Sequence, residues 1–224
     1  MQCQFCKEKC QKAGKQRNGA QKLYCKGCRK YQQVSYQYIA CQSHVDSMVS
    51  QLVCESVGVR GIARVLRIGI NTVVRRIIFI ANGISKPPIP SGRPVFEVDE
   101  LWTYIGRKEN EYWLVYALDR NTRQVMDFVI GKRTKATLKI LIDNLLVSGV
   151  RKIRTDKLRI YQRLIPKGIH CYGQYCTNRI ERKNLSIRTH LKRLGRRTIC
   201  FNRSAWMLES CLKIYFWERL MAKR

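Results

Sequence analysis

Acidic residues are scarce in this chain, and their scarcity is the first guide to its partners. The 224 residues include 15 Asp and Glu against 44 Lys and Arg, which gives a formal net charge of +29. A positive charge of this size indicates a polyanionic partner, and the phosphate backbone of double-stranded DNA fits it best. An anionic membrane would require a concentrated polybasic cluster or a basic amphipathic helix, whereas here the charge runs through the whole chain.

Long hydrophobic runs are absent as well. No stretch approaches the roughly 18 uncharged apolar residues of a membrane-spanning helix, and the N-terminus has no signal-peptide pattern. We therefore expect a soluble cytoplasmic protein with no membrane association. The hydrophobic content of 45% supports a packed core, so the positive charge does not belong to a disordered basic tail.

Composition changes along the chain and predicts its domains. Residues 1–44 are rich in Cys, Lys and Gln, and residues 45–85 have a helical period. A proline- and glycine-containing linker, KPPIPSGRP, follows at residues 86–94. Residues 95–224 then have the pattern of a single α/β domain.

The α/β pattern consists of an antiparallel meander followed by alternating helices and strands. The meander is predicted from β-rich runs separated by polar turns, and a glycine ends the first helix. In chain order we predict strands at 95–106, 111–119 and 123–131, a helix at 134–149, a strand at 150–156, a helix at 157–165, a strand at 168–172, and helices at 177–197 and 202–220. This order predicts a mixed sheet flanked by helices.

Paired cysteines near the N-terminus predict a structural zinc site. Two C-x2-C pairs are separated by eighteen residues, and the four predicted ligands are Cys3, Cys6, Cys25 and Cys28. A segment this short and poor in apolar residues has no core of its own, so we expect bound Zn2+ to stabilise a ribbon-like fold. Exchange of one ligand for Cys10, Cys41 or His44 stays open. The basic residues around the cysteines suggest contact with DNA.

Residues 57–77, VGVRGIARVLRIGINTVVRRI, have the layout of a helix-turn-helix. A helix near 60–66 is followed by a turn at Ile68 and Gly69, and Asn71 is a good N-cap for the second helix. We predict a shared core of Ile62, Leu66, Val73 and Ile77. The side chains left to reach a DNA groove or its phosphates are Thr72, Arg75 and Arg76. The alternative is a helical hairpin that only packs.

Because acids are few, their positions are informative. Between residues 150 and 197 the only acids are Asp156 and Glu181, among fifteen Lys and Arg. Asp156 ends a predicted strand, Asp99 lies in the first strand of the α/β region, and Glu181 lies early in a basic helix. If the two strands are neighbours, the three carboxylates converge. They would repel one another unless cations lay between them, and two Mg2+ ions about 3.5–4 Å apart, or Mn2+, meet that need.

Plainer roles remain open for each acid. Asp156 also fits a turn cap, and Glu181 also fits an ion pair with Arg188 on the same helix. Glu100 is the alternative to Asp99, since adjacent residues of a strand point to opposite faces and the pattern alone does not choose between them.

Three stretches resemble transposases of the bacterial insertion sequence one family. VDELWTYIG, RTDKLRIY and NRIERKNLSIRTHLKRLGRRT match the family's D-E-[LM]-W strand, T-D strand end and R-x-E-R-x-N helix. Paired cysteines followed by a helix-turn-helix match it too. The resemblance covers nearly the full chain in the right order, and the helix that carries Glu181 is its most specific part.

The resemblance implies an RNase H-like catalytic domain with Asp99, Asp156 and Glu181 as a DDE triad, which selects Asp99 over Glu100. Such enzymes bind the terminal inverted repeats of an insertion sequence, cut a strand with a metal-activated water, and join the 3′-hydroxyl to target DNA. No covalent protein–DNA intermediate is needed. To these roles we add four predicted DNA contacts on the basic helix: Arg182, Arg188, His190 and Lys192.

Two further expectations follow from the same resemblance. The protein should act as a homo-oligomer in the bacterial cytoplasm, associated with the nucleoid, because two transposon ends are processed together. The competing hypotheses are a non-catalytic DNA-binding regulator and an RNase H-like nuclease or resolvase. A regulator gives no reason for three acids at these strand and helix positions.

Overall fold

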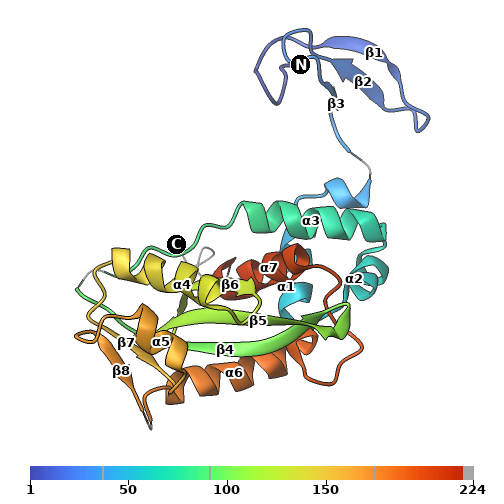
Figure 1. The fold of residues 1–224 in the computed structure, drawn as a ribbon. Coiled ribbons are helices and arrows are strands. Elements are labelled where there is room, and N and C mark those ends of the chain that lie inside the picture. The colour runs from blue at the N-terminus through green and yellow to red at the C-terminus, as the bar shows by residue number, and fades with distance from the viewer. Residues whose placement is uncertain (37, 91, 174, 219–224) are drawn as a thin grey trace. The chain divides into compact units, whose positions relative to one another are not determined.

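Contacts within the chain separate its cysteine-rich beginning from the rest. The computed structural model describes residues 1–36, 38–90, 92–173 and 175–218, and the chain divides into two units, Met1–Val45 and Asp46–Arg224. The first unit contains an antiparallel sheet of β1 (Gln11–Lys15), β2 (Gln21–Tyr24) and β3 (Tyr31–Gln33), followed by the short η1 (Ile39–Cys41) (Figure 1). Its buried cluster consists of three cysteines and Leu23.

Three helices open the second unit, and two of them have the predicted helix-turn-helix order. These helices are α1 (Val45–Cys54), α2 (Val59–Leu66) and α3 (Ile70–Asn82). All four predicted core residues of α2 and α3 are buried: Ile62, Leu66, Val73 and Ile77. The predicted N-cap was wrong, because α3 begins after Gly69 and takes Asn71 into its first turn. Glycine is also tolerated at an N-cap, and its extended backbone ends the turn one residue earlier than expected.

A five-stranded mixed sheet forms the centre of the second unit, as predicted. Its strands, in chain order, are β4 (Val95–Ile105), β5 (Arg107–Asp119), β6 (Val125–Gly131), β7 (Lys152–Thr155) and β8 (His170–Tyr172). In space the order is β6-β5-β4-β7-β8. The first three strands form the antiparallel meander, and β7 and β8 add parallel to β4.

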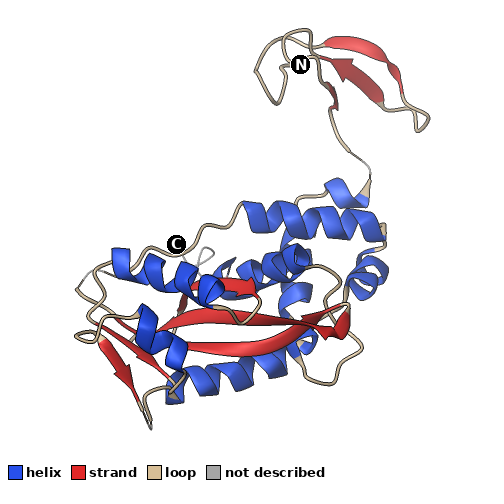
Figure 2. Cartoon of the chain, viewed as in Figure 1, coloured by secondary structure: helices blue, strands red, loops and turns tan. Residues whose placement is uncertain are grey.

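Helices cover both faces of this sheet and give it two apolar cores. They are α4 (Lys135–Val147), α5 (Arg159–Leu164), α6 (Asn178–His190) and α7 (Ala205–Lys213), the last continued by a π-helix at Ile214–Glu218. One core joins the sheet to α6 and α7, and the other joins it to α4 and α5. Figure 1 shows α4 and α6 on opposite sides of the strands, and Figure 2 shows the helical layers around them. Among the described residues, no helix is long and apolar enough to cross a bilayer.

The basic helix is shorter than predicted. It ends at His190 because Leu191 leaves helical geometry, and a single 3-10 turn follows at Lys192–Leu194. Leu191 and Leu194 are nevertheless buried with Ile180 and Ile187, so an apolar stripe begins on the helix and continues past its end. The last helix begins at Ala205, three residues after its predicted start, and its predicted end at residue 220 lies outside the described residues.

The predicted linker at 86–94 has no helix or strand in its described part, yet it is attached to the sheet. Lys86 Nζ lies 3.0 Å from Asp127 Oδ2 on β6, and Asn144 of α4 donates to the same oxygen. Asp127 itself is a buried residue. Pro94 O accepts from Arg151 N immediately before β7.

A buried glutamate attaches α6 to the middle of the sheet. Glu97 of β4 is fully buried, and its Oε2 accepts hydrogen bonds from the backbone N–H groups of Arg179 and Ile180, at 3.0 and 2.9 Å. Its Oε1 pairs with Arg120 at 2.9 Å. A carboxylate at a helix N-terminus satisfies free N–H groups and favours the helix dipole. The start of α6 is therefore held against β4.

We expect Glu97→Ala to lower the free energy of unfolding by about 3 kcal/mol, because it leaves two helix N–H groups and one arginine without their acceptor. Urea denaturation of the variant and the wild type measures the difference. Asp143→Ala is the matched control on an exposed face of α4 and should change the free energy by less than about 0.5 kcal/mol. Equal losses in the two variants would contradict an anchoring role for Glu97.

Candidate active site

The pairing of β4 with β7 brings Asp99 and Asp156 to the same level of the sheet. The strands run parallel with Glu97 opposite Arg154, so two residues further along each chain Asp99 is level with Asp156. Asp156 follows the last residue of β7, and its Oδ1 accepts from Leu158 N at 2.9 Å. The turn-capping role considered for Asp156 is thus real, and it leaves the other carboxylate oxygen available.

The carboxylate closest to both Asp99 and Asp156 belongs to Glu100. Glu181 lies outside this group of three acids. One carboxylate oxygen from each of Asp99, Glu100 and Asp156 lies within 4.8 Å of the other two. Glu181 is exposed on the first turn of α6, where its Oε1 accepts from Thr177 Oγ1 at 2.8 Å. The alternative ion pair of Glu181 with Arg188 is not formed between these two described residues, because Arg188 donates to backbone carbonyls elsewhere.

Burial and mutual repulsion raise the pKa values of two of these acids. Burial raises the pKa of Asp99 to about 6, and the charges of Asp156 and Glu181 add to the rise, while hydrogen bonds from Glu100 N and Asn184 oppose it. Burial likewise raises the pKa of Glu100 to about 7, with further contributions from Asp156 and Asp99. Glu181 is therefore close enough to influence Asp99, even though it lies outside the tight group.

A second link between β4 and α6 runs through Asn184. Its Nδ2 donates to Asp99 Oδ2 at 2.7 Å, and its Oδ1 accepts from the Tyr116 hydroxyl at 2.8 Å. The same hydroxyl lies 3.2 Å from the Ile180 carbonyl. Because Asn184 lies one helical turn after Glu181, this network sets the rotation of α6 and so the direction in which Glu181 points.

Sequence reasoning did not identify Glu97 or Asn184 as parts of this site. A signal for Glu97 was available, since it lies two residues before Asp99 on the same strand face and a helix N-terminus favours a carboxylate. Asn184 belongs to the quoted R-x-E-R-x-N stretch, but its role depends on Tyr116 of β5, which is distant in sequence.

The acidic site has the chemistry of a divalent cation site. Carboxylate oxygens are the preferred ligands of Mg2+ and Mn2+, and Glu100 Oε1 is a buried oxygen without a hydrogen-bond partner among the described residues. Acids whose pKa values are raised by one another are stabilised by a cation placed between them. The donor set therefore fits such an ion.

The four basic-helix residues predicted to contact DNA differ in their surroundings. Arg182 and Lys192 are exposed. Arg188 donates to the carbonyl oxygens of Leu194 and Trp102, at 2.8 and 3.4 Å. His190 Nδ1 lies 2.8 Å from the Tyr215 hydroxyl. All but Arg188 are exposed, and the side chains of Arg188 and His190 already have hydrogen-bond partners within the chain.

The predicted contacts of the helix-turn-helix also differ. Arg75 is exposed and Thr72 is half-buried on α3. Arg76 forms an ion pair with Asp46 of α1 at 3.4 Å, so its guanidinium is not the unengaged group that the sequence predicted. This pair links the first helix to the third.

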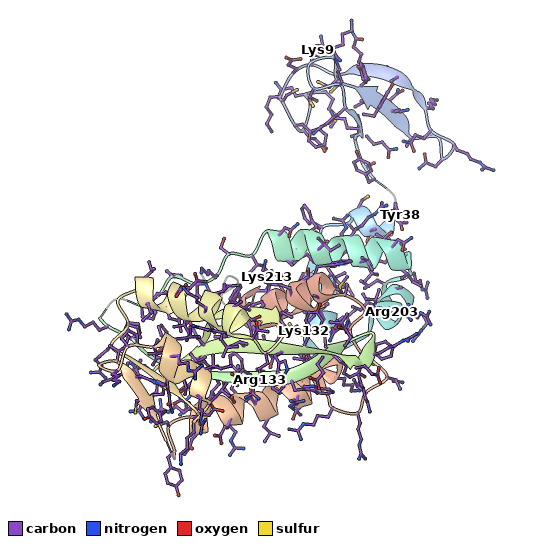
Figure 3. The ribbon with its side chains drawn as sticks, in the orientation of Figure 1. Lys9, Tyr38, Lys132, Arg133, Arg203 and Lys213 are labelled. Carbon is purple, nitrogen blue, oxygen red and sulfur yellow. The ribbon has the colours of Figure 1, made fainter. Side chains whose placement is uncertain are left out.

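The four predicted zinc ligands gather in the first unit. The Sγ atoms of Cys3, Cys6, Cys25 and Cys28 all lie within 4.8 Å of one another. Cys10 lies outside this group, and its sulfur accepts from Gln32 Nε2. Cys41 and His44 are exposed and also lie outside it. Figure 3 draws the sulfur atoms in yellow. The cluster is compatible with a zinc ribbon.

Comparison with protein families gives two matches that together cover most of the chain. The family model described as IS1 transposase matches residues 95–221, and the model described as InsA C-terminal domain, a helix-turn-helix, matches residues 36–78. The first match contains the whole five-stranded sheet and the acidic site. The second contains α1 and α2 and most of α3.

Curated relatives match the part of the chain around the sheet. Insertion element iso-IS1n protein InsB of Shigella dysenteriae is 38% identical over 118 residues, which is 53% of this chain and 90% of the relative. Insertion element IS1 protein InsB of Shigella flexneri is 39% identical over 119 residues, 53% of this chain and 91% of the relative. Insertion element IS1 2 protein InsB of Escherichia coli K12 is 41% identical over 108 residues, 48% of this chain and 65% of the relative.

One solved structure with a weak likeness is a cryoEM structure of a simian T-cell lymphotropic virus intasome in complex with PP2A regulatory subunit B56 gamma. The match has 14% identity and a TM-score of 0.35, and it covers 65% of this chain and 59% of that chain. A likeness at this level does not establish a shared fold.

We expect Tyr116→Phe to lower the free energy of unfolding by about 1–2 kcal/mol, because the buried hydroxyl serves both Asn184 and the Ile180 carbonyl. Chemical denaturation measures the loss. Tyr112→Phe changes a half-buried ring on the same strand and is the control, with an expected change below about 0.5 kcal/mol. A Tyr116→Phe variant as stable as the wild type would contradict the proposed link between β5 and α6.

Proposed function

Since the chain belongs to the IS1 transposase family, whose members are DNA transposases with a DDE catalytic domain and a helix-turn-helix, we propose that Asp99, Asp156 and Glu181 are its catalytic metal ligands. The observation that carries the proposal is the parallel register of β4 and β7, which makes Asp99 level with Asp156. The attachment of α6 to β4 through Glu97 and Asn184 supports Glu181 as the third acid.

The proposed reaction is metal-dependent cleavage of a DNA strand at the end of the element, followed by transfer of its 3′-hydroxyl to target DNA. Bound Mg2+ or Mn2+ would supply activation of the attacking oxygen and stabilisation of the leaving oxygen. The protein contributes the carboxylates that hold the ions and the exposed Arg182 and Lys192, which are suited to contact phosphates. No Ser or Tyr nucleophile takes part.

The protein's architecture supports this assignment at a finer level. We assign an RNase H-like fold to residues 95–224, on the basis of the antiparallel meander extended by two parallel strands with helices on both faces. Residues 1–44 are proposed as a zinc ribbon, 45–85 as the DNA-binding helix-turn-helix, and 86–94 as the connecting segment. Exposed Arg75 and half-buried Thr72 on α3 are the proposed contacts to the terminal repeats.

Two copies of the chain are needed if both ends of an element are processed together, so we propose that the active form on DNA is a homo-oligomer. The net charge of +29 fits simultaneous contact with end DNA and target DNA.

The proposal is tested by Glu181→Gln in a cleavage and strand-transfer assay with matched end DNA and Mg2+. We expect end binding to be retained, and strand cleavage to fall by about 100-fold or more, since a carboxylate directed at the metal site is lost. Glu209→Gln, an exposed acid of α7 paired with Lys213, is the matched control and should cleave like the wild type.

Each outcome of this assay has a defined meaning. Equal cleavage by wild type and Glu181→Gln would remove Glu181 from the catalytic site. Loss of end binding in Glu181→Gln with normal cleavage of non-specific DNA would point to a role in recognition instead.

We expect the full chain to contain one Zn2+ per molecule, held by the four clustered cysteines. Cys25→Ser removes the most buried of these thiols and should abolish the bound zinc, as measured by elemental analysis and a chromophoric chelator. Cys54→Ser, a buried cysteine of α1 outside the cluster, is the control and should keep the zinc. A zinc content unchanged in Cys25→Ser would rule out the four-cysteine site.

A further inference from the structure

We propose that Glu100 is a fourth acidic ligand of the catalytic site, and that Asp99, Glu100 and Asp156 together bind one divalent cation without Glu181. This inference rests on the proposed function, because it refines which acids hold which ion. It assigns Glu181 to the second ion only. The site thereby acquires one cation position that is formed by the sheet alone.

The geometry of the sheet edge makes this grouping possible. Adjacent residues of β4 point to opposite faces, so Asp99 is directed toward α6 and Asn184, while Glu100 is directed toward the side of α4 and α5. Strand β7 ends at Thr155, so Asp156 lies beyond the end of the neighbouring strand. The Asp156 side chain can therefore approach carboxylates on either face of β4, both Asp99 and Glu100.

The three carboxylates lie close enough together to be candidates for one ion. One oxygen from each of the three acids lies within 4.8 Å of the other two. Oxygens bound to one Mg2+ lie at most about 4.2 Å apart, twice the usual metal–oxygen distance of about 2.1 Å. Neighbouring oxygens around one octahedral Mg2+ lie about 3 Å apart, so the three side chains must move closer together to share an ion.

Glu100 has an oxygen for which the described protein supplies no partner. Its side chain is 1% exposed, and Oε1 is buried without a hydrogen bond. The Tyr161 hydroxyl lies close enough to the carboxyl group to oppose the rise in the pKa of Glu100, but neither this hydroxyl nor Glu100 Oε1 has a partner in hydrogen-bonding geometry among the described residues. A buried carboxylate oxygen left unpaired is costly, and a cation between the acids removes that cost.

The neighbouring arginine does not account for the arrangement. Arg133, labelled in Figure 3, approaches the other oxygen, Oε2, at a long 3.4 Å, and its side chain is 38% exposed. One partly solvated guanidinium balances one carboxylate weakly, and three acids lie together here. Glu181 meanwhile has its own donor in Thr177 Oγ1 and stays outside the group.

The test is a titration of the zinc-loaded full chain with Mn2+ in the absence of DNA, with free Mn2+ followed by electron paramagnetic resonance. We expect Glu100→Gln to weaken binding of the tightest Mn2+ by about tenfold or more, and Glu181→Gln to leave that ion bound. Asp127→Asn is the matched control, since it neutralises another buried acid two strands away and should bind Mn2+ like the wild type.

Thermal unfolding separates a ligand from a structural residue. If Glu100 binds metal, the metal-free Glu100→Gln protein should unfold at the same temperature as the wild type or higher, because one of three mutually repelling acids is gone. Mn2+ should then raise its unfolding temperature less than it raises that of the wild type. A residue serving only the Arg133 pair would lower the metal-free unfolding temperature and leave the Mn2+ effect unchanged, which would overturn the proposal.

Asp156→Asn distinguishes failure of this inference from failure of the proposed function. If Asp156→Asn loses Mn2+ while Glu100→Gln binds it normally, the metal site stands and the role of Glu100 falls. If Asp156→Asn and Glu100→Gln both bind Mn2+ normally, the acidic site itself is not the metal site.

Discussion

The short parallel pairing between β4 and β7 is the constraint on which the acidic site depends. Only three residues of each strand are paired, yet their register fixes Asp99 opposite the first residue beyond β7. Because β7 ends at Thr155, Asp156 is not part of the strand ladder. Its side chain can therefore turn toward the carboxylates of β4. The meander positions β4 in the middle of the sheet, and α6 is then attached to that same strand by Glu97. Strand β4 thus carries Asp99, Glu100 and also Glu97, the residue that anchors the helix bearing Glu181.

Two opposite electrostatic arrangements occur close together. Glu97 is fully buried but well satisfied, since it accepts from two backbone N–H groups and from Arg120. Three residues along, the Glu100 side chain is almost equally buried, and one of its oxygens has no hydrogen-bond partner within the described part of the chain. Burial alone therefore does not identify a functional acid, because a structural carboxylate is surrounded by donors. An acid surrounded by other acids, with a raised pKa, has the surroundings expected of a metal ligand.

Much of the fold followed from local pattern, and the site followed only in part. The meander, α4 and the carboxyl ends of the strands were predictable because alternation and helical period are local signals, whereas β5 begins at Arg107, four residues before its predicted start. The end of α6 was not, since Leu191 and Leu194 continue the apolar stripe after the helix has stopped. The choice between Asp99 and Glu100 could not be made from alternation, because the open end of β7 allows both strand faces to reach Asp156. Asn184 acquires its role from Tyr116, and pattern along the chain does not report such tertiary contacts.

The end of α6 is joined to the helix-turn-helix by a hydrogen bond from Lys192 N to Ser56 Oγ at 2.6 Å, between α1 and α2. A helix of 13 residues, about 20 Å long, therefore connects the acidic edge of the sheet to the helices that match a DNA-binding family. Along a DNA strand this length corresponds to about six nucleotide steps. In such an arrangement the offset between a recognised sequence and the phosphate that is cut depends on the length of α6.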